Sequence, residues 1–150
     1  MNTLRAAIVG AMVMPALVQA GEIAQVKSAH DVPTTMDALE AAVNGAGATV
    51  FARVDHAGGA AKVDLELAPS ELLIFGNPKL GTPAMQDDAL AGLYLPLKVL
   101  VYADAAGDVW LSYEEPKAML GKLDGVSTEA EYLAKMAGAL GKLTAKAAGE

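Results

Sequence analysis

His56 and its neighbour Asp55 are the first residues whose types and spacing could do chemistry. A carboxylate beside an imidazole can fix the tautomer of the ring and raise its basicity, as a general base requires. The alternative is that Asp55 caps a short helix extending to about Leu65, with His56 as a surface or packing residue. The other histidine, His30, could approach His56 only if the first two strands of the fold were neighbours.

A second candidate lies in the stretch of residues 76–85, which is rich in glycine and proline. We expect Gly81 to permit a tight turn and Thr82 to cap a new helix over residues 83–90. Free amides after Gly81, the positive end of that helix and the Lys79 ammonium could converge on a carboxylate or phosphate. The alternative is a rigid turn with a solvated lysine. The residues of this predicted ligand site are Asn77, Lys79, Gly81, Thr82 and His56.

Several kinds of catalytic site are disfavoured by the motifs that are missing. Residues 76–82 have the glycine spacing of a nucleotide-binding P-loop, but Thr82 stands where that motif needs a lysine. We therefore reject nucleotide hydrolysis. No Gly-x-Ser-x-Gly elbow marks a serine nucleophile, and no cysteine is present to act as nucleophile, thiolate ligand or disulfide partner.

Metal binding has little support in the spacing of the histidines. There are two of them, with no His-x-x-x-His pattern, and this is few for a transition-metal site. Met85 and Met119 could be soft axial ligands together with His56, which leaves haem or copper open. Methionines at helical spacing are more often core residues. We expect no tightly bound cofactor, with haem as the minority alternative.

Five strands are predicted from β-branched and aromatic runs bounded by turn residues. Their ranges are 23–28, 49–54, 72–75, 97–103 and 109–113. The third run is continuously apolar, so we expect it to be a central strand or one buried on both faces. The last two runs are predicted to form a hairpin, because Asp and Gly residues connect them.

Two longer helices are predicted from apolar residues that recur at helical spacing. The first opens within residues 33–37, with Thr34 as its cap, and ends at residues 44–45. The second opens with Thr128 and Glu131, which have the spacing of a capping box. Its apolar residues continue to the C-terminus, and we expect this long helix to lie across the sheet.

Residues 72–85, with the sequence LLIFGNPKLGTPAM, resemble the signature segment of the domain-of-unknown-function 302 (DUF302) family. Residues 49–56, 95–104 and 109–113 agree with that family in the expected order. The resemblance implies a single α+β domain of the TATA-binding-protein-like type, in the order strand, helix, four strands, helix, with a curved antiparallel sheet. It also implies a homodimer. It implies no activity, because the family's function is unassigned and a shared fold does not supply one.

The first 20 residues have the pattern of a secretory signal peptide. A short positive start is followed by an apolar run, and small residues precede an expected cleavage site after Ala20. An uncleaved membrane anchor is the alternative, but the run is short and Pro15 interrupts it. We therefore predict a mature domain of residues 21–150, periplasmic or secreted and not bound to membrane after cleavage.

The charge of the chain is acidic, with 18 acidic and 11 basic residues and a net charge of −7. Cleavage removes Arg5 and no acidic residue, so ten basic residues remain against 18 acidic ones, a net charge of −8. An acidic surface repels phosphates and anionic lipid headgroups. We therefore exclude nucleic acid as a partner.

Three functions remain open at this point. The preferred one is a non-enzymatic, exported binding protein, a homodimer whose curved sheet and long C-terminal helix enclose a pocket near His56 and residues 76–85. Its ligand would be small, an anion or a porphyrin. The second is an enzyme in which His56 is the general base, oriented by Asp55, while Lys79 and loop amides stabilise negative charge. The third is a structural or interaction module, for which an exposed Trp110 would be evidence.

Overall fold

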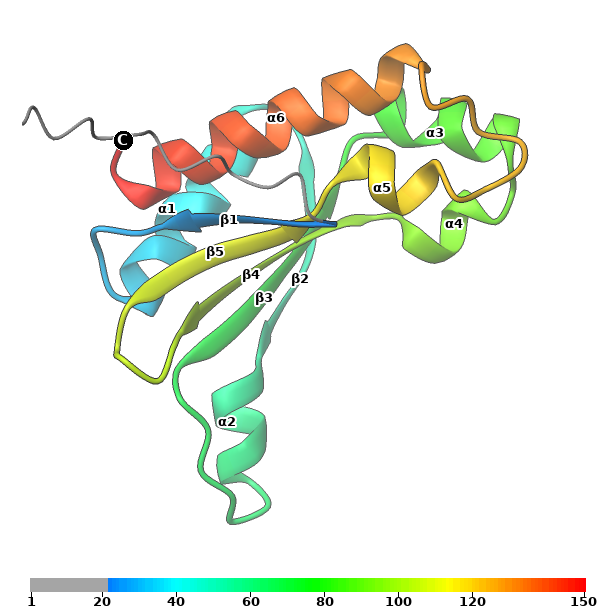
Figure 1. The fold of residues 1–150 in the computed structure, drawn as a ribbon. Coiled ribbons are helices and arrows are strands. Elements are labelled where there is room, and N and C mark those ends of the chain that lie inside the picture. Colours follow the sequence, from blue (N-terminus) through cyan, green and yellow to red (C-terminus); the bar gives the residue numbers. More distant parts are fainter. Residues whose placement is uncertain (1–21) are drawn as a thin grey trace, which may run out of the picture.

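A computed structural model describes residues 22–150 and places them around one antiparallel sheet of five strands (Figure 1). The strands are β1 (Ile23–Lys27), β2 (Thr49–Asp55), β3 (Ser70–Gly76), β4 (Leu97–Ala103) and β5 (Val109–Glu114). Their spatial order is β1-β5-β4-β3-β2, so β4 is the middle strand and β1 and β2 are the edges. The predicted signal peptide, residues 1–20, lies outside the described residues.

Two longer helices cover one face of this sheet, and four short ones lie in the connections (Figure 1). The longer ones are α1 (Val32–Gly45) and α6 (Glu131–Ala148), and α6 runs across the sheet. The short ones are α2 (His56–Ala61), α3 (Pro78–Asp87), α4 (Ala91–Tyr94) and α5 (Pro116–Leu120). Within residues 22–150, none of these helices has the length and apolar character needed to cross a bilayer.

The hydrophobic core lies between the sheet and the two longer helices. Alternate residues of the three inner strands point into it, because side chains along a strand alternate between faces. These inward residues are Leu73, Phe75, Val99, Val101, Leu111 and Tyr113. The helices meet them with residues at three- and four-residue spacing, namely Met36, Leu39, Val43, Leu133, Met136, Leu140 and Leu143. The other face of the sheet carries no helix in the described part of the chain.

The strand predictions are confirmed. The order of elements is strand, helix, four strands, helix, once the short helices are counted as parts of the connections. The predicted hairpin is the β4–β5 pair, in which Leu100 faces Ser112 and Ala103 faces Val109. The continuously apolar run is β3, which lies inside the sheet between β2 and β4.

Two predicted helix caps are wrong. Asp31 rather than Thr34 caps α1, since its Oδ1 accepts a hydrogen bond from the Thr34 amide at 2.9 Å, and bonding to Thr34 lowers the pKa of Asp31. The helix therefore starts earlier than Pro33 suggested. The capping box at Thr128 is absent, because a turn bonds the Ala130 amide to the Ser127 carbonyl and α6 begins only after it.

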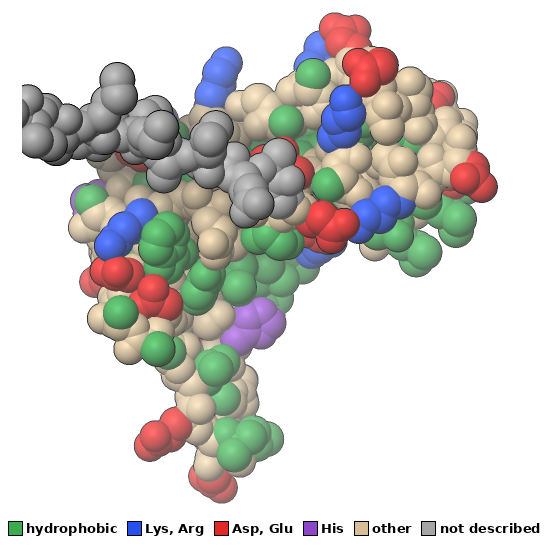
Figure 2. All heavy atoms as spheres, in the orientation of Figure 1, with side chains coloured by type: hydrophobic (Ala, Val, Ile, Leu, Met, Phe, Trp, Pro, Cys, Tyr) green, Lys and Arg blue, Asp and Glu red, His purple; other side chains and the backbone are tan. Residues whose placement is uncertain are grey.

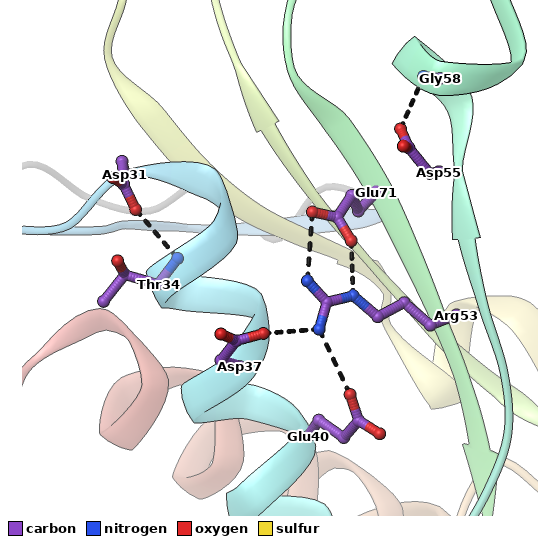
Figure 3. Close-up of polar contacts among 8 residues, drawn as sticks. All are labelled: Asp31, Thr34, Asp37, Glu40, Arg53, Asp55, Gly58 and Glu71. Carbon is purple, nitrogen blue, oxygen red and sulfur yellow. Dashed lines mark hydrogen bonds and ion pairs between the residues drawn. The ribbon is translucent and has the colours of Figure 1, made fainter.

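Arg53 links the edge of the sheet to α1 (Figure 3). Its guanidinium donates to both carboxylate oxygens of Glu71 on β3, at 2.5 and 3.2 Å. It also donates to Asp37 at 2.6 Å and to Glu40 at 3.4 Å, both on α1. The bond to Glu71 is the largest cause of the raised pKa of Arg53. One cation therefore holds three carboxylates that would otherwise repel one another.

Tyr132 ties the start of α6 to the end of α3, because its hydroxyl donates to Asp87 Oδ2 at 2.8 Å. Burial, and then this bond, raise the pKa of Tyr132 from 10.0 to about 12. The associated stability is therefore complete below pH 10 and is lost as the pH rises toward 12. We expect Tyr132→Phe to cost about 1 kcal/mol of unfolding free energy at pH 8.

Urea unfolding of wild type and of Tyr132→Phe at pH 8 and pH 11 measures the contribution of the Tyr132–Asp87 hydrogen bond to stability. The gap between wild type and Tyr132→Phe should narrow at pH 11, because at that pH Tyr132 is ionised in the unfolded chain, where its pKa is near 10.0, but must keep its proton in the folded one. Tyr94→Phe is the control, since no hydrogen bond of the Tyr94 hydroxyl is recorded within residues 22–150. A gap that is unchanged between the two pH values would contradict the assignment.

Candidate ligand-binding site

A cavity of about 440 Å³ opens beside the core, where the β2 and β3 strands meet α3 and α6. Four parts of the chain line it: the start of β2, the end of β3 with α3, the segment before β4, and one face of α6. Its lining is dominated by apolar side chains, including Phe51, Phe75, Leu80, Met85, Leu95, Leu97, Met136 and Leu143. Cavities that bind small organic ligands have about this size, roughly 300–1,000 Å³.

The helix α3 forms one wall, and it begins earlier than the sequence predicts. Asn77 is the N-cap, with its Oδ1 accepting from the Lys79 amide at 3.0 Å, and Pro78 occupies the first turn. The predicted helix start at Thr82 is therefore wrong, and Gly81 and Thr82 lie within the helix. Of the predicted helix over 83–90, residues 83–87 form the later part of α3, which ends at Asp87, and α4 begins only at Ala91.

This earlier start changes what the segment can bind. The amides of Leu80 and Gly81 both donate to the Asn77 carbonyl, at 2.9 and 3.0 Å. With the Lys79 amide bonded to the Asn77 side chain, the first amides of the helix are occupied. They are not free to bind a carboxylate or phosphate in the way expected of a helix opening at Thr82.

Phe51 reaches the cavity because β2 is irregular. The register of β2 against β3 shifts between Val50 and Ala52, so Phe51 is the extra residue of a β-bulge. Its side chain lines the cavity while remaining 59% exposed, and Met85 across from it on α3 is 41% exposed. Exposed aromatic and thioether groups at a cavity mouth suit contact with an apolar ligand.

The polar chemistry of the cavity is sparse. Asn77 and Thr82 are the lining residues whose side chains carry oxygen or nitrogen, and the Asn77 oxygen is already used for capping. The rest of the lining can exclude water but donates few hydrogen bonds. Such a site can hold an apolar body and orient it with one or two polar contacts.

The structure brings together three of the five residues of the predicted ligand site, with Met85, the candidate haem or copper ligand, beside them. Asn77, Gly81, Thr82 and Met85 line the cavity, whereas Lys79 and His56 are not in its lining. Lys79 lies exposed on α3.

His56 opens α2, is exposed, and follows Asp55, whose Oδ1 accepts from the Gly58 amide at 2.7 Å. Asp55 therefore caps a helix, and within residues 22–150 no hydrogen bond between Asp55 and the His56 ring is recorded. His30 is far from His56 in the fold, because β1 and β2 lie at opposite edges of the sheet.

Metal ligands do not gather in the described part of the chain. Residues 22–150 contain no group of three or more His, Cys, Asp or Glu residues that could hold a metal ion. His56 and Met85, the candidates for haem or copper, do not share the cavity. Trp110 is half-buried rather than exposed, and its ring nitrogen donates to Asp104 at 2.9 Å, which lowers the pKa of Asp104.

The sequence predicts that the sheet and the long C-terminal helix enclose a pocket near residues 76–85, and one face of α6 lines the cavity. Met136 and Leu143 were expected in the core, and they are buried there, but they also face the cavity. The space exists because small residues stand at facing positions, among them Ala46, Ala48 and Ala139. A local excess of alanine opposite a methionine-containing helix face was the available signal.

The sheet, its helices and this cavity define an α+β domain with a site of small-molecule size. The chain belongs to the DUF302 family, described as a domain of unknown function, which matches residues 24–143. The match confirms the resemblance seen in residues 72–85. The crystal structure of an uncharacterized conserved DUF302 protein from Bacillus stearothermophilus superposes with a TM-score of 0.77 at 19% identity, covering 85% of this chain and 99% of that one. This likeness supports the fold alone.

Curated relatives extend the comparison. A protein of Brucella suis named fluoride-specific ion channel FluC 1 is 38% identical over 138 residues, which are 91% of this chain and 54% of the relative. The protein of Brucella abortus named fluoride-specific ion channel FluC 1 and that of Brucella melitensis named FluC 2 are also 38% identical to this chain over 138 residues. The matched residues are 50% of the length of each of these two relatives. The chain therefore spans about half the length of the curated relatives it matches.

Proposed function

We propose that this protein is a non-enzymatic binding protein for a small apolar or amphipathic molecule, held in the cavity between β2, β3, α3 and α6. The observation that carries this proposal is a preformed cavity of about 440 Å³ with an almost entirely apolar lining. Apolar surface removed from water contributes roughly 25 cal/mol per Å², so a ligand that fills such a cavity gains affinity from burial alone. No ionic anchor is required.

This ligand class refines the one expected from the sequence. An anion would need free amides or a cation, and the α3 amides are occupied while Lys79 lies outside the lining. A haem held by His56 and Met85 would need both in the cavity, and Met85 lines it while His56 does not. The geometry therefore favours an apolar body with at most one polar end near Asn77 or Thr82.

The test is native mass spectrometry of protein purified without added ligand, together with a fluorescence titration. The probe is 1-anilinonaphthalene-8-sulfonate, competed with a medium-chain fatty acid. We expect saturable binding of one probe per chain, displaced by the competitor. Absence of both a co-purifying mass and saturable probe binding would reject the proposal, and an intense visible band would favour a porphyrin instead.

His56→Phe separates this proposal from the enzyme alternative. We expect probe affinity to change by less than about twofold, because His56 is exposed at the start of α2 and outside the cavity. If His56 were a general base, substitution would lower a turnover rate by about two orders of magnitude or more. A probe titration checks the binding proposal, and turnover of a panel of esterase and phosphatase substrates checks the enzyme alternative. His30→Phe is the matched control in both measurements.

A second candidate function, a role in fluoride handling, is favoured by the names of the three Brucella relatives. Against it stands the cavity lining, which among the described residues holds no cationic side chain and carries side-chain donors only on Asn77 and Thr82. Thermal unfolding in sodium fluoride and in sodium chloride distinguishes the two. A saturable stabilisation by fluoride that chloride does not produce would favour this candidate, and equal effects of the two salts would favour the apolar ligand.

We also propose that the protein is exported, with residues 21–150 as its mature periplasmic or secreted domain. Support comes from the leader pattern of residues 1–20. The TATA-binding-protein-like description of the fold is likewise a proposal, supported by the order of the elements and by the uncovered sheet face. N-terminal sequencing of protein recovered from a periplasmic extract tests the cleavage site.

A further inference from the structure

The connection between β2 and β3, residues 56–69, projects away from the sheet as an arm (Figure 1). It consists of α2 and a return segment that carries Val63, Leu65 and Leu67, exposed by 64, 65 and 53%. No residue of α2 is buried. The arm therefore combines a small helix with a row of large apolar side chains in water.

The arm has little of its own to keep it ordered. Helix α2 has six residues and includes Gly58 and Gly59, and helices this short are unstable in isolation. The chain reverses at Asp64, which has a positive φ of 57°, and the Leu65 amide bonds back to Ala60 at 3.1 Å. Exposed apolar groups on such a segment mark a surface that another surface covers.

A surface of matching character lies on the same chain. The sheet face opposite α1 and α6 presents the outward residues of the strands, in which apolar side chains alternate with polar and charged ones such as Gln25, Lys27 and Glu114. The apolar ones include Ile23, Val54, Leu72, Ile74 and Leu100. Figure 2 shows hydrophobic side chains along a hollow between the arm and the α4 end of the molecule. We call this surface the open sheet face.

The charges of the two surfaces are complementary. Lys98 stands on the open sheet face, between Leu97 and Val99 that point into the core, and its Nζ donates to the Tyr94 carbonyl at 3.0 Å. Among the described residues no carboxylate is recorded in an ion pair with Lys98. The arm carries Lys62 at the end of α2, and Asp64 and Glu66 within its return segment, so its acidic residues outnumber its basic one.

We propose that the arm of each copy docks on the open sheet face of a second copy, with Glu66 of one chain facing Lys98 of the other. Because both surfaces belong to one chain, a two-fold axis allows the arm of each copy to pack on the open sheet face of the other copy. Each contact then occurs twice, which helps to reach the roughly 1,200–2,000 Å² of total buried surface typical of a stable interface. The proposal does not depend on what the cavity binds.

Other occupants fit these surfaces less well. A membrane surface would meet Asp64 and Glu66 at the tip of the arm and a chain of net charge −7, both of which anionic lipids repel. An unrelated protein would have to cover the arm and the open sheet face separately, whereas a second copy covers both with one symmetry operation.

Charge exchange tests the proposal on the full chain. We expect wild type to be a dimer by light scattering coupled to size exclusion. Glu66→Lys and Lys98→Glu should each raise the dissociation constant of the dimer by about tenfold or more, because each variant dimer contains two like-charge contacts. An equimolar mixture of the two variants should regain the dimer mass. In that mixed pair one contact is reversed and the other is native, so both are attractive.

The matched control is Lys142→Glu, an exposed charge reversal on α6, away from both surfaces, which should leave the dimer intact. A second measurement does not depend on how well the charge variants fold. Because the chain has no cysteine, Glu66→Cys and Lys98→Cys chains can be mixed and treated with a short bismaleimide. We expect a cross-linked pair in the mixture and little in either variant alone.

Three results would overturn the proposal. One is a wild-type chain that is monomeric at tens of micromolar. Another is a dimer that the charge variants leave intact and that yields no cross-link between positions 66 and 98, which would place the dimer contact elsewhere. The third is recruitment to vesicles of phosphatidylglycerol by wild type but not by Leu65→Ser, which would assign the arm to a membrane.

Discussion

Substitution Ala139→Phe is expected to lower affinity for an apolar ligand by at least about tenfold while leaving the fold intact. Ala139 lies on α6, half-buried, and lines the cavity of about 440 Å³. A phenyl ring at this position points into the space that the ligand would fill. Because the ring enters an existing cavity, it need not displace core side chains, and filled cavities commonly stabilise a protein by about 0.5–2 kcal/mol.

The measurement is a titration with 1-anilinonaphthalene-8-sulfonate beside a urea unfolding curve. Ala134→Phe is the matched control, because it makes the same change on an exposed position of the same helix. It should retain probe affinity. Equal loss of affinity in both variants would indicate a general effect on α6, and full affinity in Ala139→Phe would place the ligand outside this cavity.

Comparing Ala139→Phe with Glu66→Lys separates ligand binding from dimer formation. The cavity lies between the sheet and α3 and α6, whereas the arm and the open sheet face involve residues 56–69 and the opposite side of the sheet. Ala139→Phe should therefore remove probe binding and preserve the dimer. Glu66→Lys should do the reverse. A variant that abolished both at once would show that the ligand site is completed by the second copy.

Elements whose signals are local could be predicted from the sequence. The β4–β5 hairpin has two β-prone runs joined by Asp and Gly residues, and no other arrangement satisfies that pattern as well. The long helix α6 repeats apolar residues at helical spacing over five turns, a signal that a few exposed positions do not blur. Family resemblance then supplied the order of the elements along the chain, strand, helix, four strands, helix, whereas the order of the strands within the sheet comes from the structure.

The start of α3 was harder to predict, because two possible helix starts lie within a few residues of each other. Asn77 followed by Pro78, and Thr82 followed by Pro83, both have a capping side chain before a proline. The first pair is used, since Asn77 directly follows β3 and its side chain accepts the Lys79 amide. Once α3 begins there, Thr82 is inside it. The choice between them depends on where the strand ends, which the local pattern does not state.

The sequence predicts a pocket enclosed by the sheet and the C-terminal helix near residues 76–85, but not its apolar lining, because that lining is made by packing. It comes from segments separated by up to 97 residues of chain, from Ala46 to Leu143, and each contributor has an ordinary local role as core, cap or loop. Phe51 lines it only because a bulge displaces it from the β2–β3 ladder. Chemistry-bearing residues such as His56 attract attention in a sequence, whereas alanines opposite a methionine-containing helix face are a weak signal that is easily overlooked.

Substitution Arg53→Met is expected to lower the free energy of unfolding by about 1–3 kcal/mol. The change keeps an unbranched apolar stem and removes the guanidinium that Glu71, Asp37 and Glu40 share. Glu71 is the costly partner, because only 15% of its side chain is exposed and it would remain charged without its cation. Arg53→Lys should cost less, since an ammonium keeps the charge but cannot bond both oxygens in a fork.

The double variant Arg53→Met with Glu71→Gln decides the mechanism. If the cost of Arg53→Met comes from an uncompensated Glu71 carboxylate, neutralising Glu71 should recover part of the stability, although a further residue has been changed. If the cost comes from lost packing of the arginine stem, the double variant should be no more stable than Arg53→Met. Urea unfolding at neutral pH and fixed protein concentration measures all four proteins on one scale, and recovery by the second substitution would establish Arg53 as the charge that holds α1 to the β2–β3 edge.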